Sequence, residues 1–245
     1  MTGGRARDGW PDQLISGPQG NYCGGMKLTK HGHACIRLEK GSRVMVIDPG
    51  TFTDVPTAMA GAEAVLITHE HADHIDPAAV LPIVDRTSGV HVYAPQAVVD
   101  QLLAHEALGG AAGRIHVLAP DDEQHIAGFD VRVVGGQHAL IHPQIPVVAN
   151  LGYLIDESVY HPGDSLIVPH GVAVQTLLVP LHAPWSKLQE TVDFVVSVRA
   201  KHAYPVHDGL LNETGLGMMS GHVTSFGSWY GTEFEYLKVG DSREV

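Results

Sequence analysis

The sequence predicts a mixed α/β domain that opens with antiparallel strands and continues with alternating strands and helices. The opening is indicated by short apolar runs in residues 26–50, separated by Lys40, Gly41 and Ser42, a combination typical of a tight turn. The alternation is indicated beyond residue 60, where apolar runs of strand length are followed by helical start signals. A chain of 245 residues is long enough to bury a core of this kind.

The first predicted elements are strands that follow a polar extension. Residues 1–25 are rich in glycine and show no hydrophobic period, so we expect a weakly ordered extension before one domain over residues 26–245. The apolar run at 44–47 predicts a buried strand that ends at Asp48. A second buried strand is expected at residues 64–68.

Helix start signals follow these strands. Asp76 and Pro77 are a typical N-cap and first helical residue, which predicts a helix through about Asp85. The remaining predicted elements are strands at residues 90–94, 131–134, 151–155, 158–161, 176–180 and 203–206, a helix that opens at Pro95 and closes near Gly109 and Gly110, and a helix that starts at a capping box of Ser186 and Gln189.

Composition limits the kinds of function. Fifteen Lys and Arg residues against 27 Asp and Glu residues give a formal net charge of -12, which opposes binding to nucleic acid or to an anionic membrane surface. No apolar run reaches the roughly 20 residues that a membrane-spanning helix needs. Because no basic and apolar leader is found and only two cysteines occur, the expected location is the cytoplasm. Histidine is abundant, with 17 residues.

The most specific motif is THEHADH at residues 68–74, directly after a predicted strand. In an extended segment, residues two apart point in the same direction, so His69 and His71 can bind one metal ion. The turn that follows directs Asp73 and His74 to a neighbouring point. The motif therefore predicts two adjacent metal positions, and its imidazole and carboxylate groups favour zinc, with manganese and iron as alternatives.

Each of the two ions needs further ligands from elsewhere in the chain. His138, Asp164 and His207 each follow a predicted strand, which makes them candidates. Spacing alone does not select them, because other histidines compete for the same roles: His142, His161, His182 and His202.

These motifs resemble those of the metallo-β-lactamase superfamily, in which H-x-H-x-D-H is followed by a distant His, an Asp in a Gly-Asp turn and a last His. The resemblance covers residues 26 to about 212. Within the superfamily the chain is similar to the branch that contains L-ascorbate-6-phosphate lactonase and many uncharacterised relatives. This similarity depends on KHGHACIRLE near the start, IDPG at 47–50, YHPGDS at 160–165 and YPVHD at 204–208.

The resemblance implies a four-layer αββα sandwich with two metal ions at one edge. By position it implies these ligands: His69, His71 and His138 for the first ion, Asp73, His74 and His207 for the second, and Asp164 for both. His138 is implied rather than His142 because it is the first histidine after the strand in that region.

Departures from other members of the superfamily narrow the expected activity. Flavodiiron oxidoreductases have Glu where this chain has His71, and zinc β-lactamases have Cys where it has Asp164, so redox chemistry and antibiotic hydrolysis are not expected. Nucleases with an inserted second domain place it among the later ligands. The short segments from His138 to Asp164 and from Asp164 to His207 leave no room for such a domain.

Two residues are candidates for supporting the metal ligands. Asp48 ends a buried strand, so we expect it to accept a hydrogen bond from a ligand imidazole or from loop amides, with simple turn formation as the alternative. His33 matches the histidine of a GHS-like string in the family, although Ala34 replaces the small hydroxyl residue. A purely structural histidine is the alternative at this position.

Three further residues are candidates for the pocket. His161 lies two residues before Gly163 and is expected to support the turn that carries Asp164. His182 and Trp185 follow the predicted strand at 176–180, where a pocket wall could form.

The leading hypothesis is a two-metal hydrolase that acts on a small-molecule ester, lactone or phosphoester. A hydroxide shared by the two ions would attack the substrate, and Asp73 would orient this hydroxide and relay its proton. The alternatives are a phosphodiesterase or nuclease of the same fold and a noncatalytic metal-binding protein. The sequence leaves a homo-oligomer open.

Overall fold

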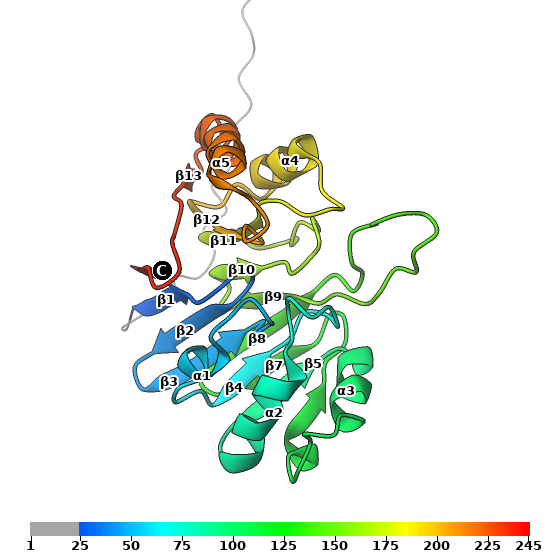
Figure 1. The fold of residues 1–245 in the computed structure, drawn as a ribbon. Helices are drawn as coiled ribbons and strands as arrows, with labels where there is room; N and C mark the ends of the chain where they lie inside the picture. The colour runs from blue at the N-terminus through cyan, green and yellow to red at the C-terminus, as the bar shows by residue number, and fades with distance from the viewer. Residues whose placement is uncertain (1–24) are drawn as a thin grey trace, which may run out of the picture.

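Two seven-stranded β-sheets pack face to face, and helices cover both outer faces (Figure 1). The computed structural model describes residues 25–245, so the extension predicted for residues 1–25 lies outside the described residues, apart from Gly25. The first sheet has the order β14 (Ser242–Glu244), β1 (Met26–Lys30), β2 (Ile36–Lys40), β3 (Arg43–Ile47), β4 (Ala64–Leu66), β5 (His91–Ala94) and β6 (Ile115–Val117). The second sheet has the order β13 (Glu233–Phe234), β12 (His202–Val206), β11 (Thr176–Pro180), β10 (Val159–His161), β9 (Gly152–Ile155), β8 (Phe129–Val134) and β7 (Glu123–Ile126).

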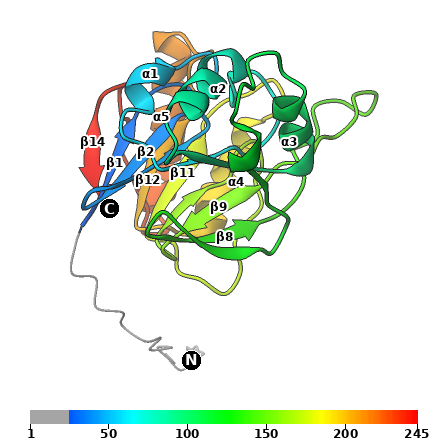
Figure 2. The ribbon, with the colours of Figure 1, turned by 90° about the horizontal axis from the view of Figure 1, so that it is seen from below.

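The helices divide between the two outer faces (Figure 1), and Figure 2 looks from below onto the face of the first sheet. The first sheet is covered by α1 (Val55–Ala58), α2 (Pro77–Arg86) and α3 (Gln96–Leu103), and the second by α4 (Leu188–Val198) and α5 (Glu213–Ser228). A short 3-10 turn, η1 (Ala112–Arg114), precedes β6. Within the described part of the chain, no helix is both long and apolar enough to cross a membrane.

Side-chain alternation along the strands builds three separate cores. In β3, Met45 and Ile47 belong to the core between the sheets, whereas Val44 and Val46 belong to the core beneath the helices of the first sheet. This pattern follows from the two-residue period of a strand with both faces buried. A third core lies between the second sheet and its two helices. The predicted four-layer αββα sandwich is therefore confirmed.

Strand direction places one set of loops at a common edge. In the first sheet β1, β3 and β4 run in the same direction, because β1 and β3 are both antiparallel to β2 and β4 is parallel to β3. In the second sheet β8, β10, β11 and β12 share one direction for the same reason. Leu151 N–H donates to the Thr68 carbonyl at 2.9 Å and joins the two sheets at this edge. Open sheets bind ligands at the carboxyl ends of their strands.

Helix boundaries match the prediction in one case and differ in two. Asp76 caps α2 through a hydrogen bond from the Ala79 N–H at 3.1 Å, as predicted. The predicted end of α3 near Gly109 is wrong, because the helix stops at Leu103. The predicted capping box before α4 is also wrong, since the Ser186 hydroxyl accepts from the Ala183 N–H at 2.9 Å instead of capping the helix.

Candidate metal centre

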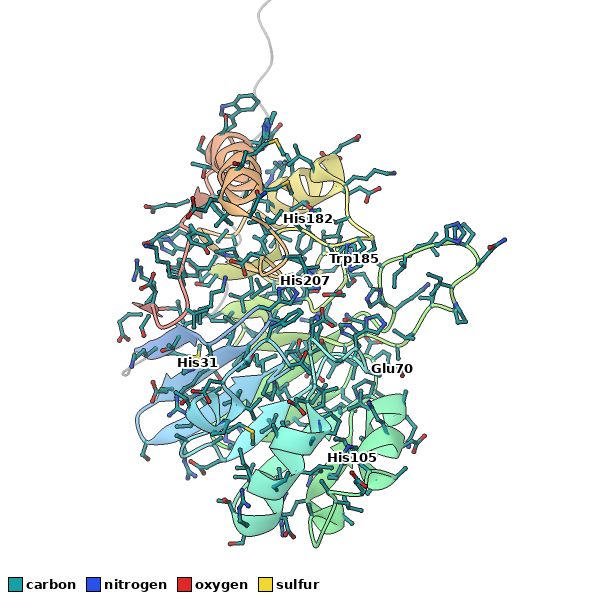
Figure 3. The ribbon with its side chains drawn as sticks, in the orientation of Figure 1. His31, Glu70, His105, His182, Trp185 and His207 are labelled. Atoms are coloured by element: carbon teal, nitrogen blue, oxygen red, sulfur yellow. The ribbon has the colours of Figure 1, made fainter. Side chains whose placement is uncertain are left out.

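Loops from both sheets bring histidine and aspartate side chains to the shared edge, where Figure 3 shows the labelled His207 beside Trp185. The loops follow strands that run toward this edge, as their common direction requires. They contribute His33 after β1, Asp48 after β3, residues 69–74 after β4, His138 after β8, Asp164 after β10 and His207 after β12.

The potential ligand atoms form three overlapping groups, and within each group all atoms lie within 4.8 Å of one another. The groups are His69, His71, His138 and Asp164; His74, Asp164 and His207; and His33, Asp73 and His207. Together they contain every ligand predicted from the sequence and add His33. Asp164 is shared by the first two groups, and His207 is shared by the last two.

Three of the imidazoles are held in one tautomer by acceptors outside the groups. The Nδ1–H of His138 donates to the Ala139 carbonyl at 2.6 Å, and that of His207 donates to the His182 carbonyl at 2.7 Å. The Nδ1–H of His74 donates to Asp48 at 2.7 Å. These bonds leave the Nε2 lone pair of each ring available as a metal ligand.

The three Nε2 atoms converge on one carboxylate. They lie 3.1 Å (His74), 3.3 Å (His138) and 3.2 Å (His207) from the oxygens of Asp164. All three atoms are buried and have no hydrogen-bond partner among the described residues. Buried polar atoms are rarely left in this state, and a site for a divalent cation explains it. The residues present therefore fit a metal ion.

Asp48 connects the first sheet to the motif loop. This fully buried carboxylate accepts hydrogen bonds from the Thr68 N–H at 2.8 Å and from the Thr68 hydroxyl at 2.7 Å, in addition to the bond from His74. Its backbone has φ of 52°, a left-handed conformation that is strained for a non-glycine residue. Asp48 thus orients both the start of the motif and one of its imidazoles.

Asp164 is held in place by a turn that requires glycine. Gly163 has φ of 62°, and a Cβ atom there would lie 2.3 Å from the side-chain oxygen of Asn150. That oxygen accepts from the Asp164 N–H at 2.9 Å, and the Trp185 indole N–H donates to the Asp164 carboxylate at 2.9 Å. Behind the turn, the ring of His161 accepts from the Gly163 N–H at 3.1 Å.

His33 has the opposite tautomer to His74, His138 and His207. Its Nδ1 accepts a hydrogen bond from the Gly209 N–H at 2.8 Å, and a backbone N–H can only donate. Burial lowers the pKa of His33, although the nearby Asp73 opposes this shift, so the neutral ring carries its proton on Nε2. His33 Nε2 lies 3.4 Å from Oδ2 of Asp73. His33 thus presents an N–H to the centre, whereas His74, His138 and His207 present lone pairs.

The turn after β12 is bonded to β1 and to the segment that follows it. His207 has φ of 56°, and its N–H donates to the His33 carbonyl at 2.6 Å. The next residue, Asp208, accepts from the buried Lys30 ammonium at 2.7 Å. Burial lowers the pKa of Lys30 and Asp208 opposes this shift, which identifies a buried ion pair that fixes the turn.

Charges at the site divide the imidazoles into two kinds. Burial and the neighbouring His74 lower the pKa of His69 well below its usual value. For His207, burial also acts to lower the pKa, but the close carboxylates of Asp164 and Asp73 outweigh it and raise the pKa to about 9. The pKa of Asp73 is lowered in turn, because His207 and His33 outweigh the effect of burial. Asp73 is therefore ionised throughout the physiological range.

A cavity of about 670 Å³ opens beside this cluster, lined by residues that include His138 and Trp185. The Trp185 ring contacts the His138 ring edge to face, with centroids 5.8 Å apart. His182, by contrast, contributes its carbonyl group to the site, and its side chain is not among those that line this cavity.

Sequence reasoning missed two residues of the site. Thr68 belongs to the quoted motif, and its hydroxyl beside two histidines could have indicated a supporting role; it lies 3.0 Å from Nδ1 of His69. Asn150 carries no local signal, since it stands in a long loop far from the motif. Its role depends on the position of the Asp164 turn in space.

Comparison with known proteins agrees with this architecture. The family model described as "Beta-lactamase superfamily domain" matches residues 27–207, so the chain belongs to the β-lactamase superfamily of metallo-β-lactamase fold. The chain is 36% identical to Protein Rv0786c of Mycobacterium tuberculosis over 217 residues, which cover 86% of this chain and 96% of that protein.

Two further proteins are similar at lower identity. A UPF0173 metal-dependent hydrolase of Xanthobacter autotrophicus is 27% identical over 173 residues, which cover 65% of this chain and 68% of that protein. The crystal structure of the metallo-β-lactamase fold protein YhfI from Bacillus subtilis superposes with a TM-score of 0.68 at 16% identity, over 90% of this chain and all of that one. At such identity the structural likeness concerns the fold.

Proposed function

We propose that the protein is a metal-dependent hydrolase that acts on a small ester, lactone or phosphoester. The observation that supports this most directly is the convergence of three buried Nε2 atoms on Asp164, each from an imidazole whose Nδ1–H is already bonded. A relative of the same superfamily is named a metal-dependent hydrolase, which supports the same class of activity.

The proposed centre holds two divalent ions, with zinc favoured by its histidine-rich ligands. The ligands would be His69, His71 and His138 for the first ion, Asp73, His74 and His207 for the second, and Asp164 for both. When bound, such a pair of ions lowers the pKa of a shared water molecule toward 7 and polarises the group under attack.

The residues around the centre have separate tasks in this proposal. Asp73 has the more accessible carboxylate, with 26% of its side chain exposed against 4% for Asp164, so it is the one that can meet a reactant. Because Asp73 is ionised, it can accept and pass on a proton at Oδ2. The Nε2–H of His33 lies 3.4 Å from that oxygen and would orient it, while Asp48 orients His74.

Two measurements on the purified protein test this function. Elemental analysis of protein purified without added metal should find close to two divalent ions per chain. A panel that contains carboxylic esters, lactones and bis-aryl phosphodiesters should reveal turnover that a chelator abolishes and added zinc restores. Two bound ions without turnover of any compound would favour a noncatalytic binding protein, and turnover of phosphodiesters alone would favour a phosphodiesterase.

A further inference from the structure

The cavity beside the metal centre shares His138 with it. Three loops form its walls: the loop after β8 that carries His138, the loop after β10 that carries Asp164, and the loop after β11 that carries Trp185. His138 itself lines the cavity, and Trp185, another lining residue, donates to Asp164. A molecule that reacts at the centre can therefore extend a substituent into a space of about 670 Å³.

Each of the three loops contributes apolar side chains to the walls of this cavity. The loop after β8, which projects from the body in Figure 1, contributes Leu140 and Ile141. The loop after β10 contributes Leu166 and Ile167, and the Trp185 indole lies on the third side. Leu140 exposes 56% of its surface and Ile167 exposes 38%, so apolar surface is available to a bound molecule. Covering such surface is favourable in proportion to the area removed from water.

Most polar groups of the lining are already occupied. The Ser165 hydroxyl accepts from the Ile167 N–H at 3.2 Å, and the Ser186 hydroxyl is bonded to the backbone of Ala183. Lys187 is the one Lys or Arg among the described residues that line the cavity, and its ammonium pairs with Glu190 at 3.2 Å. A phosphate group is typically held by several cationic or N–H donors. The cavity lacks such a cluster.

We infer that the substrate is an uncharged carboxylic ester or lactone whose acyl or aryl group is apolar and occupies this cavity. The inference rests on the proposed hydrolase function and narrows it. Substrates that place a phosphate in this cavity are disfavoured, because the carboxylate of Glu190 would face them and Lys187 is already paired.

A series of p-nitrophenyl esters tests the inference on the zinc-loaded protein. We expect kcat/KM to rise from acetate through butyrate to octanoate, by roughly threefold per methylene until the cavity is filled, because each buried methylene is transferred from water to an apolar wall. Equal values for acetate and octanoate would overturn the inference and leave the hydrolase function intact. Turnover confined to bis-p-nitrophenyl phosphate would overturn it as well.

A binding measurement separates the cavity from catalysis. Calorimetric titration of the zinc-loaded protein with the hydrolysis products should give tighter binding of octanoate than of acetate, whatever the turnover. If no ester, lactone or phosphodiester is hydrolysed, the proposed function fails, while tighter octanoate binding still supports an apolar cavity. Octanoate binding no tighter than acetate binding would overturn the inference.

Variants of the cavity wall test whether it determines the selectivity for long acyl groups. Leu140→Asp and Ile141→Asp should each lower the ratio of octanoate to acetate kcat/KM by about tenfold, because a charge is introduced where the acyl group of the substrate would lie. Val239→Asp is the matched control, since Val239 is 67% exposed and does not line the cavity, and its ratio should equal that of the unaltered protein. A thermal melt of each variant checks its fold. An unchanged ratio in both cavity variants would overturn the assignment.

Discussion

At the scale of single residues, the direction of each ring proton distinguishes the histidines of this site. His74, His138 and His207 donate from Nδ1 to oxygen acceptors and offer Nε2 to the centre, whereas His33 accepts at Nδ1 and offers an N–H. Lone pairs bind cations, and an N–H does not. His33 therefore contributes to the centre through Asp73, by orienting its carboxylate.

Removal of the His33 ring should weaken one half of the centre. We expect His33→Ala to lower kcat roughly 10- to 100-fold and to weaken binding of the second ion, while the first ion is retained, because the partner that orients a ligating carboxylate is lost. His33→Gln should recover part of the loss, since its amide can supply an N–H donor. Metal titration and kcat/KM on a verified substrate measure both effects.

The neighbouring histidine provides the control for this experiment. His31 lies on the same segment but belongs to none of the groups of potential ligands, so His31→Ala should retain both ions and normal turnover. Equal effects of His31→Ala and His33→Ala would indicate damage to the segment and would contradict a positioning role.

The proton-relay role of Asp73 is tested by removing its charge while its shape is kept. Asp73→Asn should leave the melting temperature close to that of the unaltered protein, because the side chain is partly exposed, yet lower kcat by roughly 100-fold or more. Circular dichroism and steady-state kinetics give the two values. Near-normal turnover in a variant that retains two ions would contradict the role.

At the scale of secondary-structure elements, the sequence predicts a helix boundary correctly where interactions within a single turn of backbone determine it. Asp76 before Pro77 predicts the start of α2 because the capping bond and the fixed proline φ act within one turn. The end of α3 is predicted too late, because the helix already ends at Leu103 and does not extend to Gly109 and Gly110. The helix α5 gives almost no signal, since its sequence contains four glycines, and it is stabilised by packing against α4 through residues such as Met219 and Val223.

The turn after β10, on the way to β11, depends on Gly163, whose neighbours in space lie outside the turn. Gly163→Ala should destabilise the protein by about 2 to 4 kcal/mol, because the new Cβ would have both an unfavourable φ and a clash with Asn150 and Thr68. Gly171→Ala isolates the first cause: its φ is 75° with nothing within 4 Å, so it should cost about 1 kcal/mol. Denaturant unfolding measures both. Equal costs would show that the Asp164 turn is not tightly packed.

At the scale of the whole molecule, the order of strands in each sheet gathers the site, and no local signal reports that order. The motif at residues 69–74 and the apolar runs are visible in the sequence because each acts within a few residues. The choice of His138 over His142 is not visible in the sequence pattern, and only the family resemblance predicts it. In the structure His138 is 3% exposed and donates to the carbonyl of Ala139, whereas His142 is exposed. The direction in which the backbone leaves β8 determines which of the two histidines reaches the centre. This direction depends on the packing of both sheets.

The charge distribution of the site makes the stability of the metal-free protein depend on pH. The pKa of His207 is raised to about 9, and that of His74 is also raised, by carboxylates that outweigh burial. An imidazole with a raised pKa stabilises the fold fully below its unfolded value, near 6.5, and this stabilisation is lost as pH rises through its folded value. His69 and His71 have lowered pKa values, so their contribution to stability rises with pH up to about 7.5 and adds no slope above it.

The melting temperature of chelator-treated protein should therefore fall from about pH 7.5 to pH 9, and bound zinc should remove most of this slope. Ligating imidazoles must be neutral, so zinc binding at pH 7.5 should release about two protons, from His74 and His207, and zinc affinity should weaken as pH is lowered toward 6. Melts across the pH range, together with calorimetry in buffers of different ionisation enthalpy, measure these effects. Zinc binding without proton release, or a slope that is the same with and without zinc, would mean that His74 and His207 are not ligands.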